Sequence, residues 1–171
     1  NTLVGGGVMN AGEVSERVGM KGISADSEEV IVARDIILGR NTGVRLHICH
    51  ISTKGSVQLL REAKLRGENV SAEVCPHHFA LTDEVVEGYD ANTKMNPPLR
   101  STKDVESLKE GLRDNTIEII ATDHAPHHKD EKNCEYDKAA FGIVGLETAL
   151  PLGVTHLVEE DILTPLQLIE K

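Results

Sequence analysis

Aromatic residues are scarce in this sequence of 171 residues, which contains no Trp, two Tyr and two Phe. Its hydrophobic core must therefore be built from Leu, Ile, Val and Ala, a composition that suits helices packed on a parallel sheet. The length allows one domain with a sizeable core. No apolar run approaches the length that crosses a bilayer, and no basic-then-apolar leader is present, so we expect no membrane association.

Cysteine is also scarce. Cys49, Cys75 and Cys134 are an odd number of widely spaced residues, and no Cys-x-x-Cys pair occurs. This pattern is a poor framework for disulfides or for a cysteine-based zinc module, and it suggests a reducing compartment. We therefore expect a cytoplasmic protein.

Positive charge is in deficit, with 18 Lys and Arg against 28 Asp and Glu and a formal net charge of −10. Such a balance argues against non-specific binding to nucleic acid or to an anionic membrane surface. A small anionic substrate stays compatible with it, because a metal ion can reverse the sign of the field inside a pocket.

Three apolar, β-branched segments predict buried strands at 44–51, 69–75 and 117–122. Residues 1–25 are rich in Gly and predict a long loop with one helical turn at 12–18. Helical spacing of apolar residues predicts the remaining elements, which are helices at about 26–40, 55–66, 101–112 and 146–159 and a last one from about 164.

This alternation of strands and helices predicts βα units and a parallel sheet. Three strands are few, since a complete eight-stranded barrel needs about 250 residues. The sequence also begins with Asn and ends inside an expected helix. We therefore expect an α/β fold in which residues 1–171 are one partial domain, the carboxyl-terminal portion (about three βα units) of a (β/α)8 TIM-type barrel.

The segment Ile119–His128 combines a short apolar strand with one carboxylate and three imidazoles. Asp123 comes at or just past the carboxyl end of the strand, where parallel α/β sheets place their chemistry. An ionised Asp is costly to bury unless a cation or hydrogen-bond donors face it. The segment can serve as a metal ligand and proton carrier, or Asp123 can simply close the strand in an Asx-turn.

The other two strands also end in histidine, at His50 and at the His77-His78 pair. Imidazole and carboxylate side chains at one rim are suitable ligands for zinc. His47 lies three residues before His50, so strand alternation predicts opposite sides of the sheet for the two rings. We take His50 as the ligand and expect His47 to face the core or a helix.

Five motifs occur in an order that resembles the carboxyl-terminal half of a bacterial-type dihydroorotase of the amidohydrolase superfamily. They are Cys49-His50-Ile51-Ser52-Thr53, Glu73-Val74-Cys75-Pro76-His77-His78, Lys94-Met95-Asn96-Pro97-Pro98-Leu99-Arg100, Ala121-Thr122-Asp123-His124-Ala125-Pro126-His127 and Phe141-Gly142-Ile143-Val144-Gly145. The resemblance covers essentially the whole chain.

The resemblance implies a role for several residues. His50 and Asp123 would bind metal, one or two Zn²⁺ ions in the complete enzyme, and Asp123 would also be the catalytic proton carrier. The resemblance further implies that the substrate would be contacted by Asn96, His127, Phe141 and Gly142. His77 and His78 lie in a family motif without being ligands, which makes them shaping or hydrogen-bonding residues.

The implied activity is the zinc-dependent interconversion of N-carbamoyl-L-aspartate and L-dihydroorotate in de novo pyrimidine biosynthesis. The family's remaining metal ligands are expected upstream of Asn1, so residues 1–171 alone should be inactive and the pair of His50 and Asp123 should hold zinc weakly. Alternatives are an allantoinase- or dihydropyrimidinase-like hydrolase, or a non-catalytic homologue. The resemblance leaves a homodimer and an aspartate transcarbamoylase partner open.

Overall fold

The computed structural model describes residues 3–171 and shows an α/β protein in which every strand pairing is parallel. The strands are β1 (Met9–Asn10), β2 (Gly22–Ile23), β3 (Leu46–Ile48), β4 (Val70–Val74) and β5 (Ile119–Ile120). The α-helices are α1 (Glu13–Val18), α2 (Asp26–Thr42), α3 (Lys54–Leu65), α4 (Pro76–Ala80), α5 (Thr102–Arg113), α6 (Lys129–Lys132), α7 (Ala149–Gly153) and α8 (Pro165–Glu170). Two 3₁₀ helices and one π-helix complete the set, and they are η1 (Asp83–Gly88), η2 (Ala91–Thr93) and η3 (Val154–Val158).

The main sheet has the strand order β3-β4-β5, and its two faces differ in chemistry. Along β4, Val70, Ala72 and Val74 are buried, whereas Ser71 and Glu73 are only partly buried. Because side chains alternate along a strand, β4 directs an apolar row to one face and a polar row to the other. The sheet therefore has a covered hydrophobic face and an open polar face.

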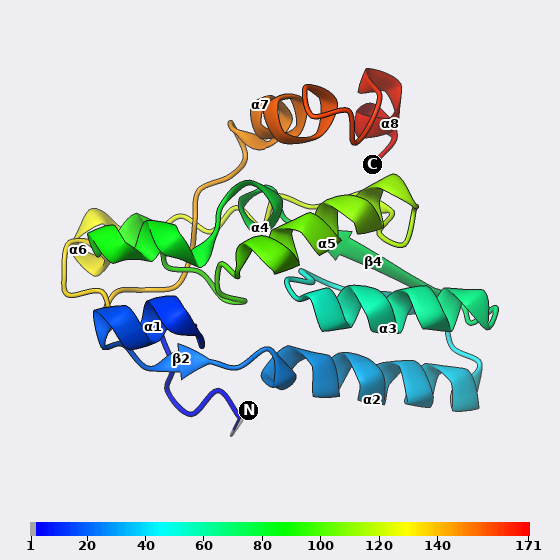
Figure 1. Cartoon of the computed structure of the whole chain (residues 1–171), viewed down its shortest axis with the longest axis horizontal. Coiled ribbons are helices and arrows are strands. Elements are labelled where there is room, and N and C mark those ends of the chain that lie inside the picture. Colours follow the sequence, from blue (N-terminus) through cyan, green and yellow to red (C-terminus); the bar gives the residue numbers. More distant parts are fainter. Residues whose placement is uncertain (1–2) are drawn as a thin grey trace.

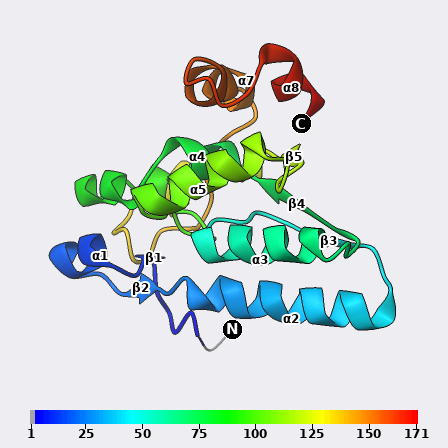
Figure 2. The ribbon, with the colours of Figure 1, turned by 45° about the vertical axis from the view of Figure 1, so that its right-hand side comes forward.

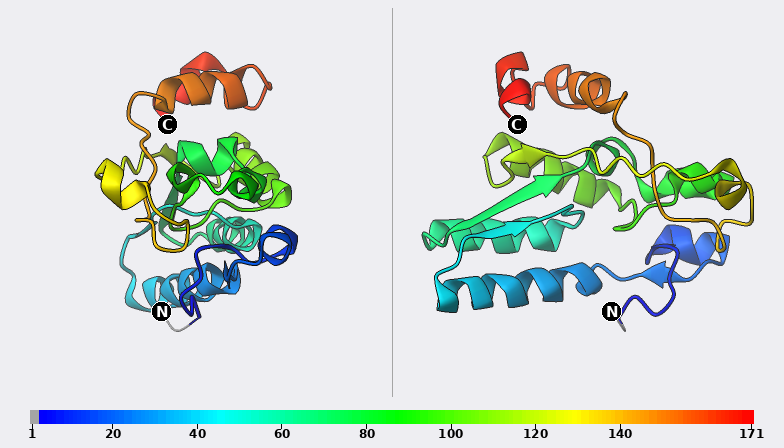
Figure 3. Two further views of the ribbon diagram at one scale, coloured as in Figure 1. Left: turned by 90° about the vertical axis from the view of Figure 1, so that its left-hand side faces the viewer. Right: turned by 180° about the vertical axis from the view of Figure 1, so that it is seen from behind.

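Helices cover the apolar face. α3 packs between α2 and α5 (Figure 1), and Figure 2 shows α2 and α3 running alongside one another. Figure 3 shows from behind that β4 runs across this layer of helices. Thr53 begins α3 by accepting a hydrogen bond from the Ser56 amide at 3.1 Å, and Ser101 and Asp104 form a capping box at the start of α5.

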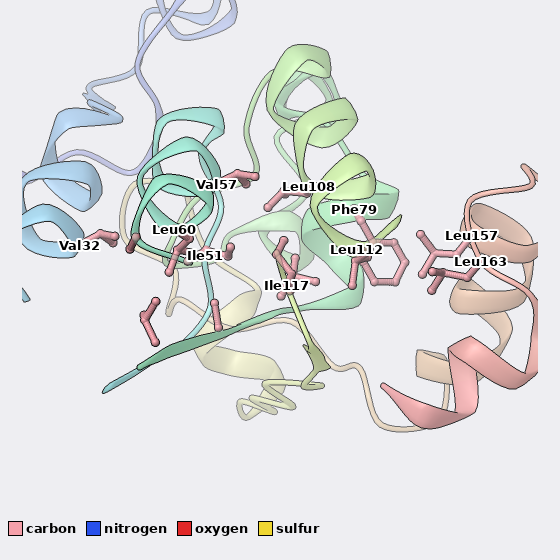
Figure 4. Close-up of a cluster of buried hydrophobic side chains, with 14 of the residues drawn as sticks. Val32, Ile51, Val57, Leu60, Phe79, Leu108, Leu112, Ile117, Leu157 and Leu163 are labelled. Carbon is pink, nitrogen blue, oxygen red and sulfur yellow. The ribbon is translucent and has the colours of Figure 1, made fainter. Parts of the chain in front are cut away.

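The core lies between the sheet and these helices (Figure 4). Leu60 from α3 and Leu108 and Leu112 from α5 are fully buried in it, together with Ile117 just before β5. The core continues past Phe79 to the carboxyl-terminal region, where η3 contributes Leu157, α8 contributes Leu168 and the connection between them contributes Leu163. Apart from Phe79 this cluster is aliphatic, as the composition predicts.

The three predicted strands and the parallel pairing are confirmed, although β3 and β5 are shorter than expected. Three expectations are wrong in detail. The Gly-rich residues 1–25 contain the short parallel pair of β1 and β2 as well as α1. The His77-His78 pair opens helix α4, with Pro76 at its first position, rather than ending a strand. The predicted helix at 146–159 begins only at Ala149 and changes to a π-helix at Val154.

No helix within residues 3–171 is both long and apolar enough to cross a membrane.

Candidate functional site

His50 and Asp123 each follow the carboxyl end of a strand, and both have left-handed backbone conformations. Their φ angles are 46° and 42°. Such angles are uncommon outside Gly, although His and Asp adopt them more readily than most residues. The conformation costs about 1–3 kcal/mol, so the surrounding structure must enforce it. Both predicted metal ligands are therefore among the residues other than Gly that have a left-handed backbone.

β4 lies between the strands that carry these two residues, because the sheet order is β3-β4-β5. His50 and Asp123 therefore do not leave directly neighbouring strands, since that would require β3 beside β5. Strands two apart are separated by about 10 Å, so both side chains must lean over the end of β4 to share an ion. The side chain of β4 at this position is Glu73.

The carboxylate of Glu73 lies beside His47 of strand β3 and beside His50, which follows this strand. One oxygen is 3.0 Å from Nε2 of His47, and the other is 3.8 Å from Nε2 of His50. Nδ1 of His47 also contacts the Ser71 hydroxyl at 2.9 Å. His47 is therefore on the open polar face with His50, and the prediction of opposite sides is wrong. Strand alternation does not extend to His50, because β3 ends at Ile48 and the backbone turns at His50.

Asp123 is partly buried, and its carboxylate accepts no hydrogen bond from the described residues. Its charge acts on two nearby thiols. Burial is the main cause that raises the pKa of Cys49 and of Cys75, and the negative charges of Glu73 and Asp123 raise both further. Glu73 and Asp123 thus make the end of the sheet electronegative. Imidazole and carboxylate are donor types that zinc uses, but among residues 3–171 neither His50 nor Asp123 belongs to a group of three ligand atoms within 4.8 Å of one another.

Asn96 lines the same cavity as His50. The cavity measures about 280 Å³, and its wall also includes Cys49, Pro97 and Arg100. The structure thus brings a predicted substrate residue next to a predicted metal ligand. A larger cavity of about 630 Å³ lies between Met20 and Tyr136, and none of the predicted site residues lines it.

A buried network of charges holds the turn that follows His50. Glu28 of α2 accepts hydrogen bonds from the amides of Ser52 and Thr53, at 2.9 and 3.2 Å, and from the Ser52 and Ser56 hydroxyls. Arg100 lies 3.8 Å from Glu28 and donates to the Ser52 hydroxyl at 3.1 Å. The network joins the Pro-Pro-Leu-Arg motif to the turn after β3, so it fixes where His50 and Asn96 lie.

The remaining predicted substrate residues form a second group. Nε2 of His127 donates to the Phe141 carbonyl at 2.9 Å, and the Gly142 amide donates to the Lys94 carbonyl at 2.9 Å. The Lys94 ammonium lies 4.4 Å from the centre of the Phe141 ring. A Cβ on Gly142 would lie 2.5 Å from the Ala125 carbonyl oxygen, so only Gly allows this approach. The loops that carry His127, Phe141 and Gly142 are thus bound to the segment just before Asn96.

His77 and His78 are almost completely buried, at 3% and 1% exposure. Burial is the main cause that lowers the pKa of His77 to about 3 and the pKa of His78 to about 4. His78 uses Nε2 to donate to the Pro97 carbonyl at 2.9 Å. This bond ties α4 to the loop that carries Asn96 and gives His78 a hydrogen-bonding role, whereas Nε2 of His77 has no partner among residues 3–171.

Two groups of contacts thus emerge, one that joins Asn96 to His50 and one that joins His127 to Phe141 and Gly142. No hydrogen bond or ion pair joins His50 to Asp123 among residues 3–171. Sequence reasoning missed Glu28, Glu73 and Arg100. Glu73 and Arg100 stand inside quoted motifs, but their partners are distant in sequence, and no local signal marks Glu28.

Comparisons with known proteins agree with the motifs. Residues 1–56 match the family described as Dihydro-orotase-like. The chain is 62% identical over 169 residues to a dihydroorotase of Pelotomaculum thermopropionicum, and 58% identical over 167 residues to one of Thermoanaerobacter sp.. These alignments cover 99% and 98% of the chain but only 40% and 39% of the relatives.

The fold also resembles solved structures. An L-hydantoinase (dihydropyrimidinase) of Arthrobacter aurescens is 30% identical, with a TM-score of 0.78 over 84% of this chain and 32% of that one. A dihydropyrimidinase of Brevibacillus agri has a TM-score of 0.79 at 23% identity, which shows similarity of fold alone. The chain is thus similar over nearly its whole length to dihydroorotases, and it spans about two fifths of the length of these relatives.

Proposed function

We propose that the full-length protein is a dihydroorotase, which interconverts N-carbamoyl-L-aspartate and L-dihydroorotate in de novo pyrimidine biosynthesis. The observation that carries this proposal is the 62% identity over 169 residues to a dihydroorotase, a stretch that includes all five motifs. The electronegative end of the main sheet, with His50, Glu73 and Asp123, supports it because a metal-dependent hydrolase needs such a donor set.

In this proposal, residues 1–171 are the carboxyl-terminal part of a (β/α)8 barrel. The main sheet supports this placement in a barrel. Helices cover one face of the sheet and the polar side chains of β4 lie on the other face, as in the wall of a barrel. The polar face of β4, with Ser71 and Glu73, would then point into the barrel. Upstream strands would continue the sheet beyond β3.

His50 and Asp123 would hold Zn²⁺, together with ligands from outside residues 1–171. When bound, zinc supplies Lewis-acid chemistry by polarising the ring carbonyl and acidifying water. Asp123 would take the proton of the attacking water and pass it to the leaving ring nitrogen. Its carboxylate is free for this task, because it accepts no hydrogen bond from the described residues.

The substrate would lie between Asn96, His127 and the loop of Phe141 and Gly142. The shared cavity of Asn96 and His50 places an amide beside the proposed metal ligand. His127 already donates Nε2 to the Phe141 carbonyl, so it can donate to a substrate carboxylate only through a protonated Nδ1.

Two observations bear on the alternatives. The 30% identity to an L-hydantoinase favours a hydantoinase- or dihydropyrimidinase-like hydrolase as the second candidate. A comparison of turnover for dihydroorotate, allantoin and dihydrouracil separates these enzymes. A non-catalytic homologue that partners aspartate transcarbamoylase would turn over none of the three.

The test of the proposal is Asp123→Asn in the full-length gene product. We expect turnover of dihydroorotate to fall by at least about 10²–10⁴-fold, because general acid–base catalysis contributes on this scale. Asp161→Asn is a matched control, since Asp161 is exposed and has a similar left-handed φ of 56°. Turnover near the wild-type rate in Asp123→Asn would refute the proposed role.

A further inference from the structure

The start of helix α4 contains three metal-binding side chains that the proposed catalysis does not use. Cys75 is the residue before the helix, and His77 and His78 are in its first turn. All three are buried, at 0%, 3% and 1% exposure. One sulfur or nitrogen ligand atom from each lies within 4.8 Å of those from the other two.

The two imidazoles have nitrogens that no described residue satisfies. Nε2 of His77 and Nδ1 of His78 are buried without a hydrogen-bond partner among residues 3–171. Nε2 of His78 is occupied by the Pro97 carbonyl, which leaves Nδ1 as the lone-pair side of the neutral ring. Buried polar atoms are nearly always paired, so two orphans in adjacent residues indicate a missing partner.

We infer that Cys75, His77 and His78 form a second metal site, which binds a thiophilic divalent cation such as Zn²⁺. One thiolate and two imidazoles are a donor set that zinc uses, and a solvent molecule can complete the tetrahedron. Zinc–ligand bonds of about 2.0–2.3 Å require donors about 3.3–3.8 Å apart, so small side-chain rotations close the site. Because His77 and His78 lie in one turn of helix α4, the helix fixes the positions of both imidazoles.

Charged side chains of both signs act on the site. The negative charges of Asp123 and Glu73 both act on the Cys75 sulfur. Arg100 acts in the opposite direction, since its positive charge lowers the pKa of His78 further after burial. A divalent ion would neutralise the negative charges of Asp123 and Glu73 and would also bind the unpaired nitrogens of His77 and His78. A water molecule could satisfy only the nitrogens.

The experiment uses Co²⁺ as the probe in the full-length gene product. A thiolate bound to Co²⁺ gives a near-ultraviolet charge-transfer band, which His50 and Asp123 cannot produce because they carry no sulfur. We expect the band in the wild type, in Asp123→Asn, and in Cys49→Ser and Cys134→Ser. It should disappear in Cys75→Ser. The Asp123→Asn arm separates this inference from the catalytic proposal.

Cys49 is the informative control, because it lies in a separate, more exposed group with His47 and Glu73. A band that persists in Cys75→Ser, that vanishes in Cys49→Ser, or that is absent from the wild type would overturn the inference. If far-ultraviolet circular dichroism shows that Cys75→Ser is misfolded, His77→Asn and His78→Asn decide. Weakening of Co²⁺ affinity by about tenfold or more in both supports the site, and unchanged affinity overturns it.

Discussion

Replacing Arg100 by Met tests the buried network that holds the turn after His50. The guanidinium is 2% exposed and donates to Asn10 Oδ1 at 2.9 Å, to the Ile23 carbonyl at 2.8 Å and to the Ser52 hydroxyl at 3.1 Å. Its charge also faces Glu28 at 3.8 Å. One side chain thus connects β1, β2, α2 and the turn that follows β3.

The expected cost follows from these contacts. A hydrogen bond that involves a charged group contributes about 1.5–3 kcal/mol, and such contributions do not add fully. Removing one partner of a buried ion pair costs about 3–5 kcal/mol, because the other charge is left uncompensated. Met fills much of the volume of Arg, so we expect Arg100→Met to lower the free energy of unfolding by about 3–5 kcal/mol. This loss is a large part of the stability of a typical domain, about 5–15 kcal/mol.

Urea unfolding of the full-length gene product measures this loss. Arg113→Met is the control, because Arg113 is exposed and, among residues 3–171, pairs with Glu110 alone on the surface of α5. We expect the control to change the free energy of unfolding by less than about 0.5 kcal/mol. A loss in Arg100→Met no larger than in the control would show that the network does not stabilise the fold.

Two further predictions concern the second loop group and the buried histidines. Gly142→Ala should lower kcat/KM for dihydroorotate by about 10–100-fold, because the added Cβ would displace the loop of His127. Gly88→Ala is the control and should change kcat/KM little, because a Cβ at Gly88 would have no heavy atom within 4 Å. Equal effects of the two substitutions would contradict the role of the close approach at Gly142. The lowered pKa values of about 3 for His77 and about 4 for His78 mean that the unfolded chain, whose His pKa is about 6.5, binds more protons below that pH. The free energy of unfolding should therefore fall by about 1–3 kcal/mol per pH unit from about pH 6 to pH 4, as measured by urea unfolding. The double substitution His77→Gln and His78→Gln should flatten this slope. An unchanged slope in the double variant would contradict the assignment of the pH dependence to these two histidines.

Local pattern was sufficient where an element is long and amphipathic. α3 and α5 follow from apolar residues at helical spacing and from polar capping residues, and both begin within one residue of the expected position. β1 and β2 could not be predicted, because each pairs only two residues and the flanking Gly-rich sequence has no strand alternation. The π-helical continuation of α7 has no local signal that we can identify.

The candidate site shows the same division. His50 and Asp123 could be predicted from the sequence because each lies at the end of a predicted strand. Their left-handed backbone conformations could not be predicted, because neither position is Gly, the residue that usually marks such a conformation. The role of Arg100 depends on Asn10, 90 residues away along the chain. Contacts of this kind arise only when the sheet assembles, so motif reasoning quoted Arg100 without finding its partners.

The central claim is that His50 and Asp123 bind one common metal ion. Anomalous diffraction at the zinc absorption edge, from crystals of the full-length gene product, tests it most directly. The account predicts a zinc peak about 2.0–2.2 Å from an imidazole nitrogen of His50 and from a carboxylate oxygen of Asp123. Crystals that hold zinc elsewhere but show no zinc shared by His50 and Asp123, or a zinc bound to only one of these two residues, would contradict it.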